Sequence, residues 1–189
     1  PQAAEFFIDY GQGISEEGLH GYHLEDALEE ALLLHPNYMM MPWDSVRFYE
    51  NRTDLLDRGL RGMGFRFLPA RIELPTIACA GDFIAVDCQL ENRASGRLCG
   101  EYAWEWVLEN DQGQRWAQTR DGSLPLYRVT REEPQRLRSI LALPVELPVG
   151  QYRLLGAIRN RAGNAIAMPL DSGENGWYTL GELTVQKGV

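Results

Sequence analysis

Aromatic side chains next to turns are the groups in this sequence best suited to contact a ligand. Trp116 and the adjacent pair Trp177 and Tyr178 each lie beside turn residues, where a ring can remain exposed. A flat apolar ring packs well against the C–H face of a sugar. We therefore predict that these three residues contact a carbohydrate. The alternative interpretation is that the rings cover an open end of the fold.

A second aromatic group recurs at every other position of one segment. Tyr102, Trp104 and Trp106 alternate with glutamates in residues 101–109, so a strand would place rings on one face and carboxylates on the other. Because carboxylates favour water, we expect the glutamate face to be exposed and the rings to pack in a core.

Metal-binding chemistry has little support in the sequence. His20 and His23 are three residues apart near glutamates, but no zinc-site spacing is present, and His35 precedes a proline that ends a helix. The acidic turns at residues 109–113 and 171–175 could hold calcium, yet neither has the alternating ligands of a dedicated calcium loop. We predict no metal and no cofactor, with calcium as the only ion that the turns suit.

Nucleophilic and nucleotide chemistry are also unsupported. No G-x-S-x-G motif is present, and Ser45, Ser123 and Ser139 have no recognisable base partner. The glycine-rich residues 11–18 (GQGISEEG) lack both the lysine of a P-loop and the spacing of a dinucleotide fingerprint.

The overall charge and the hydrophobic pattern argue against nucleic-acid and membrane partners. The 189 residues carry a formal net charge of -9, and Lys187 is the only lysine, so we expect no nucleic-acid partner. No apolar stretch approaches the roughly 18 residues of a membrane span, and the first residues show no signal peptide, so we expect no membrane partner. The odd number of cysteines (Cys79, Cys88 and Cys99) leaves the redox compartment open.

The first 64 residues predict two βα units. Residues 5–10 (EFFIDY) and 37–43 (NYMMMPW) have the composition of strands, while residues 24–34 have helical periodicity. A second helix is expected from Thr53, with its hydroxyl as the N-cap, to Gly62 or Gly64. This order predicts the last two βα units of a larger (β/α) barrel, or alternatively a small α/β layer packed on the following domain.

From about residue 65 the hydrophobic period changes to two. Residues 83–91 alternate most clearly, and turn residues separate seven or eight short strands. This pattern predicts an antiparallel β-sandwich of immunoglobulin or fibronectin type over residues 65–189, and an α+β fold for the whole chain. The expected strands span residues 65–74, 83–91, 101–109, 115–120, 137–143, 152–159, 165–169 and 177–185.

Several sequence segments resemble those of a known group of proteins. The segments HPNYMMMPW, MGFRFLPARIELP, GDFIAVDCQLEN, LPVGQYRLLGAIRN and NGWYTLGELTV resemble the C-terminal portion of an uncharacterised glycoside-hydrolase-like family, in which a (β/α)8 barrel precedes a β-sandwich. The resemblance implies that residues 5–10 and 37–43 are the last two barrel strands. It places Asp9 and Tyr10, then Trp43 and Asp44, at the rim of a substrate pocket.

The resemblance implies only part of a hydrolytic site. Asp9 would be the one catalytic carboxylate, while Tyr10, Trp43 and Asp44 would contact carbohydrate. Glycoside hydrolysis commonly needs two carboxylates, so we expect this chain alone not to be catalytic. The expected partners are a carbohydrate and the remainder of a barrel, and a secreted or cell-envelope location suits such a protein.

Three hypotheses about function stay open at this point. The chain can be the end of a glycoside-hydrolase-like protein whose sandwich binds carbohydrate or braces the barrel. It can be a stand-alone carbohydrate-binding module, or a structural or protein-interaction β-sandwich.

Overall fold

The computed structural model describes residues 3–5, 24–40, 52–171 and 175–187, which belong to two compact units. The first, called the α/β unit, comprises residues 1–65, 92–99 and 130–132. The second, called the sandwich unit, comprises residues 66–91, 100–129 and 133–189. Two short segments within the predicted sandwich sequence therefore group with the α/β unit.

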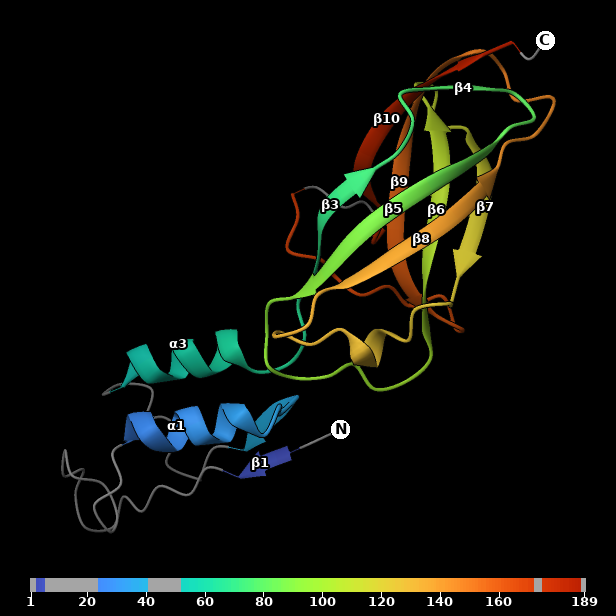
Figure 1. The fold of residues 1–189 in the computed structure, drawn as a ribbon. Helices are drawn as coiled ribbons and strands as arrows, with labels where there is room; N and C mark the ends of the chain where they lie inside the picture. The colour runs from blue at the N-terminus through green and yellow to red at the C-terminus, as the bar shows by residue number, and fades with distance from the viewer. Residues whose placement is uncertain (1–2, 6–23, 41–51, 172–174, 188–189) are drawn as a thin grey trace. The chain divides into compact units, whose positions relative to one another are not determined.

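The α/β unit contains a parallel strand pair and two helices (Figure 1). Strands β1 (Ala3–Glu5) and β2 (Tyr38–Met40) pair in parallel, and helix α1 (Leu24–Leu33) lies between them in the sequence. Helix α3 (Thr53–Gly62) follows. Parallel pairing across a helix is the geometry of a βαβ crossover, so the described residues have the strand and helix order expected from the sequence. Residues 6–10 and 41–43 of the two predicted strands lie outside the described residues.

The two helices approach closely at a glycine. A Cβ atom at Gly59 of α3 would lie 3.3 Å from Leu28 Cδ1 of α1, so the absence of a side chain there allows the contact. Two ion pairs also join the helices, Arg58 with Glu29 and Arg52 with Glu25. The helix pair thus combines a small apolar contact with charge pairing.

The expected cap of α3 is wrong. Thr53 is the first helical residue, and Arg52 occupies the N-cap position without a side-chain cap hydrogen bond. The Arg52 guanidinium instead bonds the carboxylates of Asp54 and Glu25. Arg52 therefore links α1 to the first turn of α3 by ion pairs, and no hydroxyl caps the helix. The predicted end is confirmed, since the helix stops at Gly62 and Gly64 has a φ of 72°.

The sandwich unit consists of two sheets, as predicted. The five-stranded sheet has the order β4-β10-β9-β6-β7, and the three-stranded sheet has the order β3-β5-β8. This arrangement corresponds to immunoglobulin-type connectivity, with β3, β5 and β8 in the places of strands A, B and E. Their bounds are β3 Phe67–Glu73, β4 Ile77–Cys79, β5 Phe83–Asn92, β6 Tyr102–Asn110, β7 Arg115–Asp121, β8 Gln135–Ala142, β9 Gly150–Asn160 and β10 Tyr178–Gln186.

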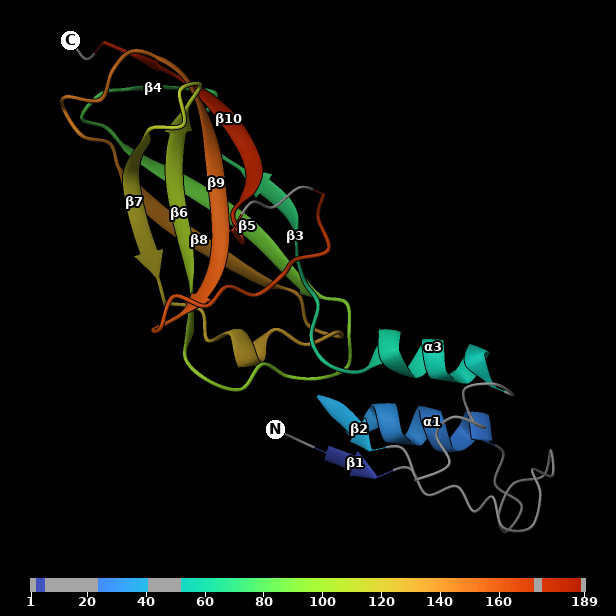
Figure 2. The same cartoon turned by 180° about the vertical axis from the view of Figure 1, so that it is seen from behind.

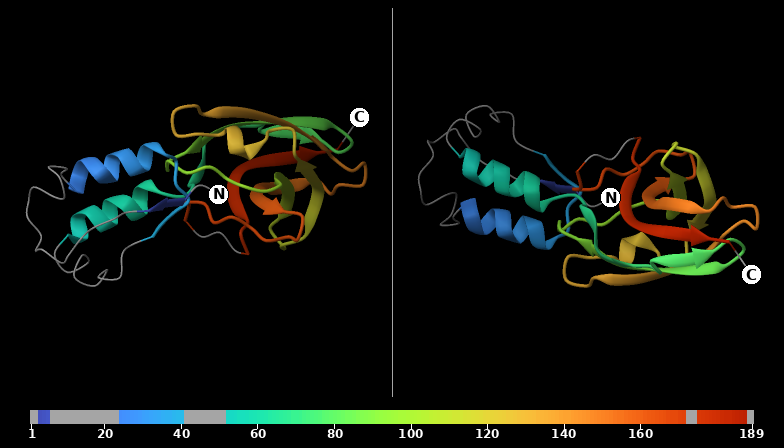
Figure 3. Two further views of the ribbon diagram at one scale, coloured as in Figure 1. Left: turned by 90° about the horizontal axis from the view of Figure 1, so that it is seen from below. Right: turned by 90° about the horizontal axis from the view of Figure 1, so that it is seen from above.

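The two sheets face each other with their strands crossed. Strands β5 and β8 lie in front of β9, β6 and β7 in Figure 1 and behind them in Figure 2. Strand β5 pairs antiparallel with β8, β6 pairs antiparallel with β7 and β9, and β9 pairs antiparallel with β10, whereas β10 and β4 are parallel. Strand β10 curves strongly (Figure 3), and its register with β9 shifts between Thr179 and Gly181, which is the bending expected of a β-bulge.

The core lies between the sheets. Strand β5 alternates as predicted and buries Ile84, Val86, Cys88 and Leu90. Strand β6 contributes Trp104 and Trp106, which are almost fully buried with ring centroids 5.0 Å apart. The core interpretation of these two rings is therefore confirmed.

One predicted strand does not form. Residues 165–169 contain only an isolated bridge between Ala165 and Arg159. The segment belongs to the connection between β9 and β10, whose Ile166 and Met168 are buried as single residues. Alternating apolar residues here reflect packing against the sandwich rather than a continuous ladder.

Candidate functional site

The outer face of the five-stranded sheet is not the exposed surface that the glutamate pattern suggested. Glu105 is only 7% exposed and forms ion pairs with Arg120 and Arg159. Glu109 forms ion pairs with Arg115 of β7 and with Arg153 of β9. The expectation of solvated carboxylates is confirmed for Glu101, which is exposed, and wrong for Glu105 and Glu109, because arginines of the neighbouring strands pair with them.

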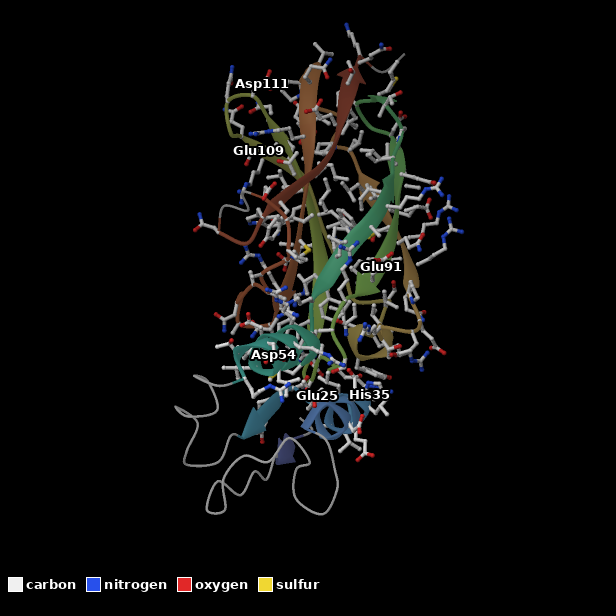
Figure 4. All side chains as sticks on the ribbon, turned by 90° about the vertical axis from the view of Figure 1, so that its left-hand side faces the viewer. Glu25, His35, Asp54, Glu91, Glu109 and Asp111 are labelled. Carbon is white, nitrogen blue, oxygen red and sulfur yellow. The ribbon has the colours of Figure 1, made fainter. Side chains whose placement is uncertain are left out.

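Cross-strand register explains these ion pairs. Glu109 of β6 lies opposite Arg115 of β7 and opposite Arg153 of β9, and Arg153 lies opposite Glu182 of β10. Opposite charges therefore alternate along one row across four strands. Such pairs stabilise a sheet, each by roughly 0.2–1 kcal/mol. Figure 4 shows Glu109 near the end of β6, close to Asp111 in the following turn.

Trp177 packs on the same face of the five-stranded sheet as these ion pairs. It forms an apolar cluster with Val107, Leu155 and Ala157, and the indole is 9% exposed. The guanidinium carbons of Arg115 and Arg159 lie 5.1 and 5.0 Å from the centroid of the Trp177 ring. Both contacts are in the range of cation–π interactions. The ring is thus covered by the protein's own arginines, which favours the interpretation that it closes the fold.

Arg159 holds the β9–β10 connection in place over the sheet. Its guanidinium donates to the carbonyl oxygens of Gly163 at 2.7 Å and Asn175 at 2.5 Å, besides facing Glu105 and Trp177. One side chain therefore links both ends of the connection to the sheet. This arrangement stabilises a surface loop and leaves no free aromatic platform at Trp177.

The other two aromatic candidates are also packed. Tyr178 is 6% exposed, and its hydroxyl accepts a hydrogen bond from the Met168 backbone at 2.9 Å. Trp116 is half-buried on β7, and its indole nitrogen is buried without a hydrogen-bond partner in the part of the chain that the structure describes. Carbohydrate contact at Trp116, Trp177 and Tyr178 stays a prediction, but burial leaves little ring surface for it.

The residues that the resemblance assigned to a substrate pocket lie outside the described residues. These are Asp9, Tyr10, Trp43 and Asp44. The same holds for His20 and His23. The third histidine, His35, has a φ of 54° just after α1, and its Nδ1 donates to the Ser95 carbonyl oxygen at 2.7 Å.

Among the residues that the structure describes, no group of three or more metal-ligand side chains is present. In the turn at residues 109–113, the Asn110 side-chain oxygen accepts hydrogen bonds from the backbone amides of Gln112 and Gln114. Glu109 is committed to its arginines. Ordinary turn chemistry therefore accounts for this segment, while the turn at residues 171–175 is only partly described. None of the described helices is both long and apolar enough to cross a membrane.

Residues 92–99 are hydrogen-bonded into the α/β unit. The Ser95 amide and hydroxyl both donate to the Gly62 carbonyl oxygen, and the Gly96 amide donates to the Gly64 carbonyl oxygen at 2.7 Å. The Gly64 amide in turn donates to the Pro36 carbonyl oxygen at 2.9 Å. A Cβ atom at Gly96 would lie 2.5 Å from the Gly64 oxygen and 2.7 Å from the Pro36 oxygen. Only glycine fits this close backbone contact.

The α/β unit also contains a hollow lined by charged side chains, called here the arginine hollow. Its volume is about 600 Å³. The lining residues come from α1, α3 and the two short segments: Glu29, Leu32, Asp54, Asp57, Arg58, Arg61, Gly62, Arg93 and Arg131. Asp54 bonds to Arg52, and this ion pair lowers the pKa of the Asp54 carboxyl. Figure 4 shows Asp54 on α3 and Glu25, the second partner of Arg52, on α1.

No sequence motif predicted the arginine hollow. Its arginines come from three segments that are far apart in the sequence, so no local motif marks them. Neither a protein-family model nor a curated protein matches the chain.

Three solved structures that share similarity with this chain are β-sandwich domains. The CARDB domain of the PF1109 protein from Pyrococcus furiosus is 10% identical, with a TM-score of 0.36 over 66% of this chain and 94% of that chain. The C-terminal domain of Wzt is 13% identical, with a TM-score of 0.40 over 67% and 73%. A Niemann-Pick type C2 protein from Japanese carpenter ant is 5% identical, with a TM-score of 0.39 over 65% and 92%. Similarity at this level identifies neither a family nor a function.

Proposed function

We propose that this chain is the C-terminal part of a glycoside-hydrolase-like, carbohydrate-active protein. In this proposal β1, α1, β2 and α3 are the last two units of a (β/α)8 barrel, and the sandwich braces that barrel. The parallel pairing of β1 with β2 around α1 supports the first part, since parallel strands need both faces covered by further elements. The sequence resemblance supports the carbohydrate class.

The observation that carries the bracing role is the integration of residues 92–99 into the α/β unit. This segment joins β5 of one sheet to β6 of the other, so it is part of the sandwich by sequence. Its Ala94, Ser95 and Leu98 are buried. Its backbone donates to the carbonyl oxygens of Gly62 and Gly64 at the end of α3 and accepts a hydrogen bond from the His35 side chain after α1. In variable immunoglobulin domains the corresponding B–C loop is a binding loop. In this protein the corresponding residues 92–99 are instead hydrogen-bonded to the end of α3.

The alternation of the chain between the units argues against a stand-alone carbohydrate-binding module. It passes from one unit to the other at residues 65/66, 91/92, 99/100, 129/130 and 132/133. A module excised at residue 66 would lose the hydrogen-bond partners of Ser95 and Gly96. Burial of the Trp104, Trp106 and Trp177 rings removes the platform that such a module would need.

Catalytic chemistry is assigned to the barrel in this proposal. Asp9 would be one carboxylate at the ends of the barrel strands, with Tyr10, Trp43 and Asp44 beside the sugar. The second carboxylate would come from other barrel strands, because two flanking carboxyl groups are needed for hydrolysis. The chain studied alone is therefore expected to show no glycosidase activity.

The bracing role is tested by comparing two glycine substitutions. Gly96→Ala places a methyl group against two backbone oxygens, whereas Gly122→Ala meets only Ala103 Cβ at 4.0 Å. Overpacking of this kind costs about 1–3 kcal/mol. We expect Gly96→Ala to lower the free energy of unfolding by about 2 kcal/mol in urea denaturation, and Gly122→Ala to leave it nearly unchanged.

Two signals distinguish bracing from independent folding. Far-UV circular dichroism reports the helices of the α/β unit, and near-UV circular dichroism reports the buried tryptophans of the sandwich. A brace predicts that Gly96→Ala shifts both transitions together. The bracing proposal fails if the helical transition shifts and the tryptophan transition does not, or if neither shifts.

The carbohydrate class is tested by affinity electrophoresis on polysaccharide gels. The bracing proposal predicts no retention of this chain on any glycan through the sandwich. Retention that is abolished by Trp116→Ala, with unchanged unfolding, would instead support the binding-module alternative. Retention that is unaffected by Trp116→Ala and abolished by Trp43→Ala would locate sugar binding in the barrel strands.

A structural or protein-interaction sandwich is the second candidate function. Exposed apolar side chains on the three-stranded sheet and the adjoining turn favour it, since Phe83 is 77% and Val145 is 82% exposed. It predicts concentration-dependent self-association in sedimentation velocity that Phe83→Asp abolishes. A monomer at all concentrations removes this support.

A further inference from the structure

The arginine hollow gathers positive charge in a strongly acidic chain. Arg58 and Arg61 come from α3, Arg93 from residues 92–99 and Arg131 from residues 130–132. The chain has 27 acidic and 18 basic residues, so random placement would give a hollow more carboxylates than guanidinium groups. Folding instead brings four guanidinium groups from three separate segments to one cavity.

Two of the three carboxylates of the hollow form ion pairs with arginines. Glu29 forms an ion pair with Arg58, and Asp54 pairs with Arg52, which lies outside the lining. With Asp57, the lining has three carboxylates against four arginines, a net charge of +1. Arg131 is exposed and forms no ion pair with any residue that the structure describes. Its planar set of donors is therefore available to a ligand.

We propose that the arginine hollow binds an anionic oxygen group, such as the carboxylate of an acidic sugar or an inorganic sulfate. Guanidinium groups form paired, charge-assisted hydrogen bonds with two oxygens of one anion. The volume of about 600 Å³ lies within the range of small-molecule sites. The neighbouring carboxylates accept hydrogen bonds from hydroxyl groups, as a sugar acid would require. This site does not depend on the proposed bracing function.

The test compares matched ligands by isothermal titration calorimetry on the whole chain at low ionic strength. Glucuronate and glucose differ at one carboxylate, while inorganic sulfate supplies the anion without a sugar. We expect glucuronate or sulfate to bind with a Kd of about 1 mM or tighter, and glucose not to bind. A glucuronate Kd at least tenfold below that of sulfate assigns the site to acidic sugars, and similar values assign it to the free anion.

Matched arginine variants locate the binding. Arg131→Ala removes a lining guanidinium, and Arg136→Ala removes an exposed guanidinium from β8 in the sandwich unit. Arg131→Ala should weaken anion binding about tenfold, the loss expected for one hydrogen-bonded charge, and Arg136→Ala should not change it. Arg131→Lys, which keeps the charge without the planar donors, should give an intermediate Kd.

Three results would overturn the proposal. These are no anion binding in the millimolar range, equal binding of glucose and glucuronate, or equal weakening by Arg131→Ala and Arg136→Ala. Unfolding of each variant in urea shows whether the fold is intact. If Arg131→Ala fails to fold, Arg131→Lys supplies the comparison, and an unchanged Kd in that variant then counts against the site.

Discussion

A hydroxyl in the sandwich core connects three strands from both sheets. Ser139 of β8 is 1% exposed, and its Oγ accepts a hydrogen bond from Trp106 Nε1 at 2.9 Å. The same hydroxyl donates to Asp121 Oδ2 of β7 at 2.6 Å. Ser139→Ala removes both hydrogen bonds and adds no volume. It therefore tests how much these two hydrogen bonds stabilise the sandwich.

The expected cost follows from burial. Without Ser139 Oγ, the Trp106 indole N–H has no partner in the core, which costs about 1–3 kcal/mol. Asp121 is partly exposed, so water replaces its lost bond at a smaller cost, about 0.5–1 kcal/mol. Ser139→Ala should therefore lower the free energy of unfolding by about 2–3 kcal/mol. Ser123→Ala removes an exposed hydroxyl that also bonds Asp121, and should cost less than about 1 kcal/mol.

The same pair of variants predicts a pH dependence. Burial opposes ionisation of Asp121, but hydrogen bonds from Ser123 and Ser139 outweigh it and lower the pKa of this carboxyl below its ordinary value of 3.8. A folded pKa below the unfolded pKa means that the unfolded state binds more protons at acidic pH. The stabilisation is therefore present above about pH 4 and is lost as the pH falls through the folded pKa. In Ser139→Ala the free energy of unfolding should therefore decrease less between neutral pH and pH 3 than in the unchanged protein.

Urea denaturation followed by near-UV circular dichroism, at neutral pH and near pH 3, measures both effects. The reasoning is refuted if Ser139→Ala costs no more than Ser123→Ala at neutral pH. A further check is the double variant Trp106→Phe with Ser139→Ala, since removing both partners should cost less than the sum of the single changes. Strict additivity would show that the indole bond contributes nothing.

Two further predictions concern the sheet surface and the cysteines. Arg159→Ala should lower the free energy of unfolding by about 2–3 kcal/mol and expose the β9–β10 connection to limited proteolysis, because it removes a guanidinium that donates to two carbonyl oxygens and forms an ion pair with Glu105. The neighbouring Arg161, whose side chain is 83% exposed, should tolerate alanine. Burial raises the pKa of the Cys88 thiol to about 12, so a thiol reagent should label exposed Cys99 at once and Cys88 only on unfolding. Mass spectrometry of labelled peptides checks this order, and equal labelling rates in the native protein would contradict it.

The strand pattern of the sandwich was readable because a period of two depends only on which side of a strand faces the core. Residues 83–91 alternate in sequence, and β5 buries every second residue, as predicted. The helix predicted at residues 24–34 was equally clear from its apolar spacing, and α1 spans Leu24–Leu33. The predicted strand at residues 165–169 failed because a single buried residue in a loop has the same local pattern as a strand.

Side-chain roles were harder to predict, because they depend on neighbours from other strands. Glu105 alternates with buried rings, so the sequence placed it in water, yet Arg120 and Arg159 and the β9–β10 connection cover it. Trp177 follows a turn, so an exposed ring was a fair expectation, but two arginines and three apolar residues enclose it. The residues that cover Glu105 and Trp177 are distant from them in the sequence, so no local pattern could indicate these contacts.

The sequence by itself determined the succession of elements: two βα segments, then strands with a period of two, because local hydrophobic periodicity is a property of consecutive residues. Only the tertiary structure decided that residues 92–99 and 130–132 join the α/β unit and that Arg58, Arg93 and Arg131 line one hollow. The physical reason is that these contacts rest on backbone carbonyls and long flexible arginines, which leave no periodic signature in the sequence. Residue Gly96 shows the difference most clearly, since its lack of a side chain matters only beside the oxygens of Pro36 and Gly64.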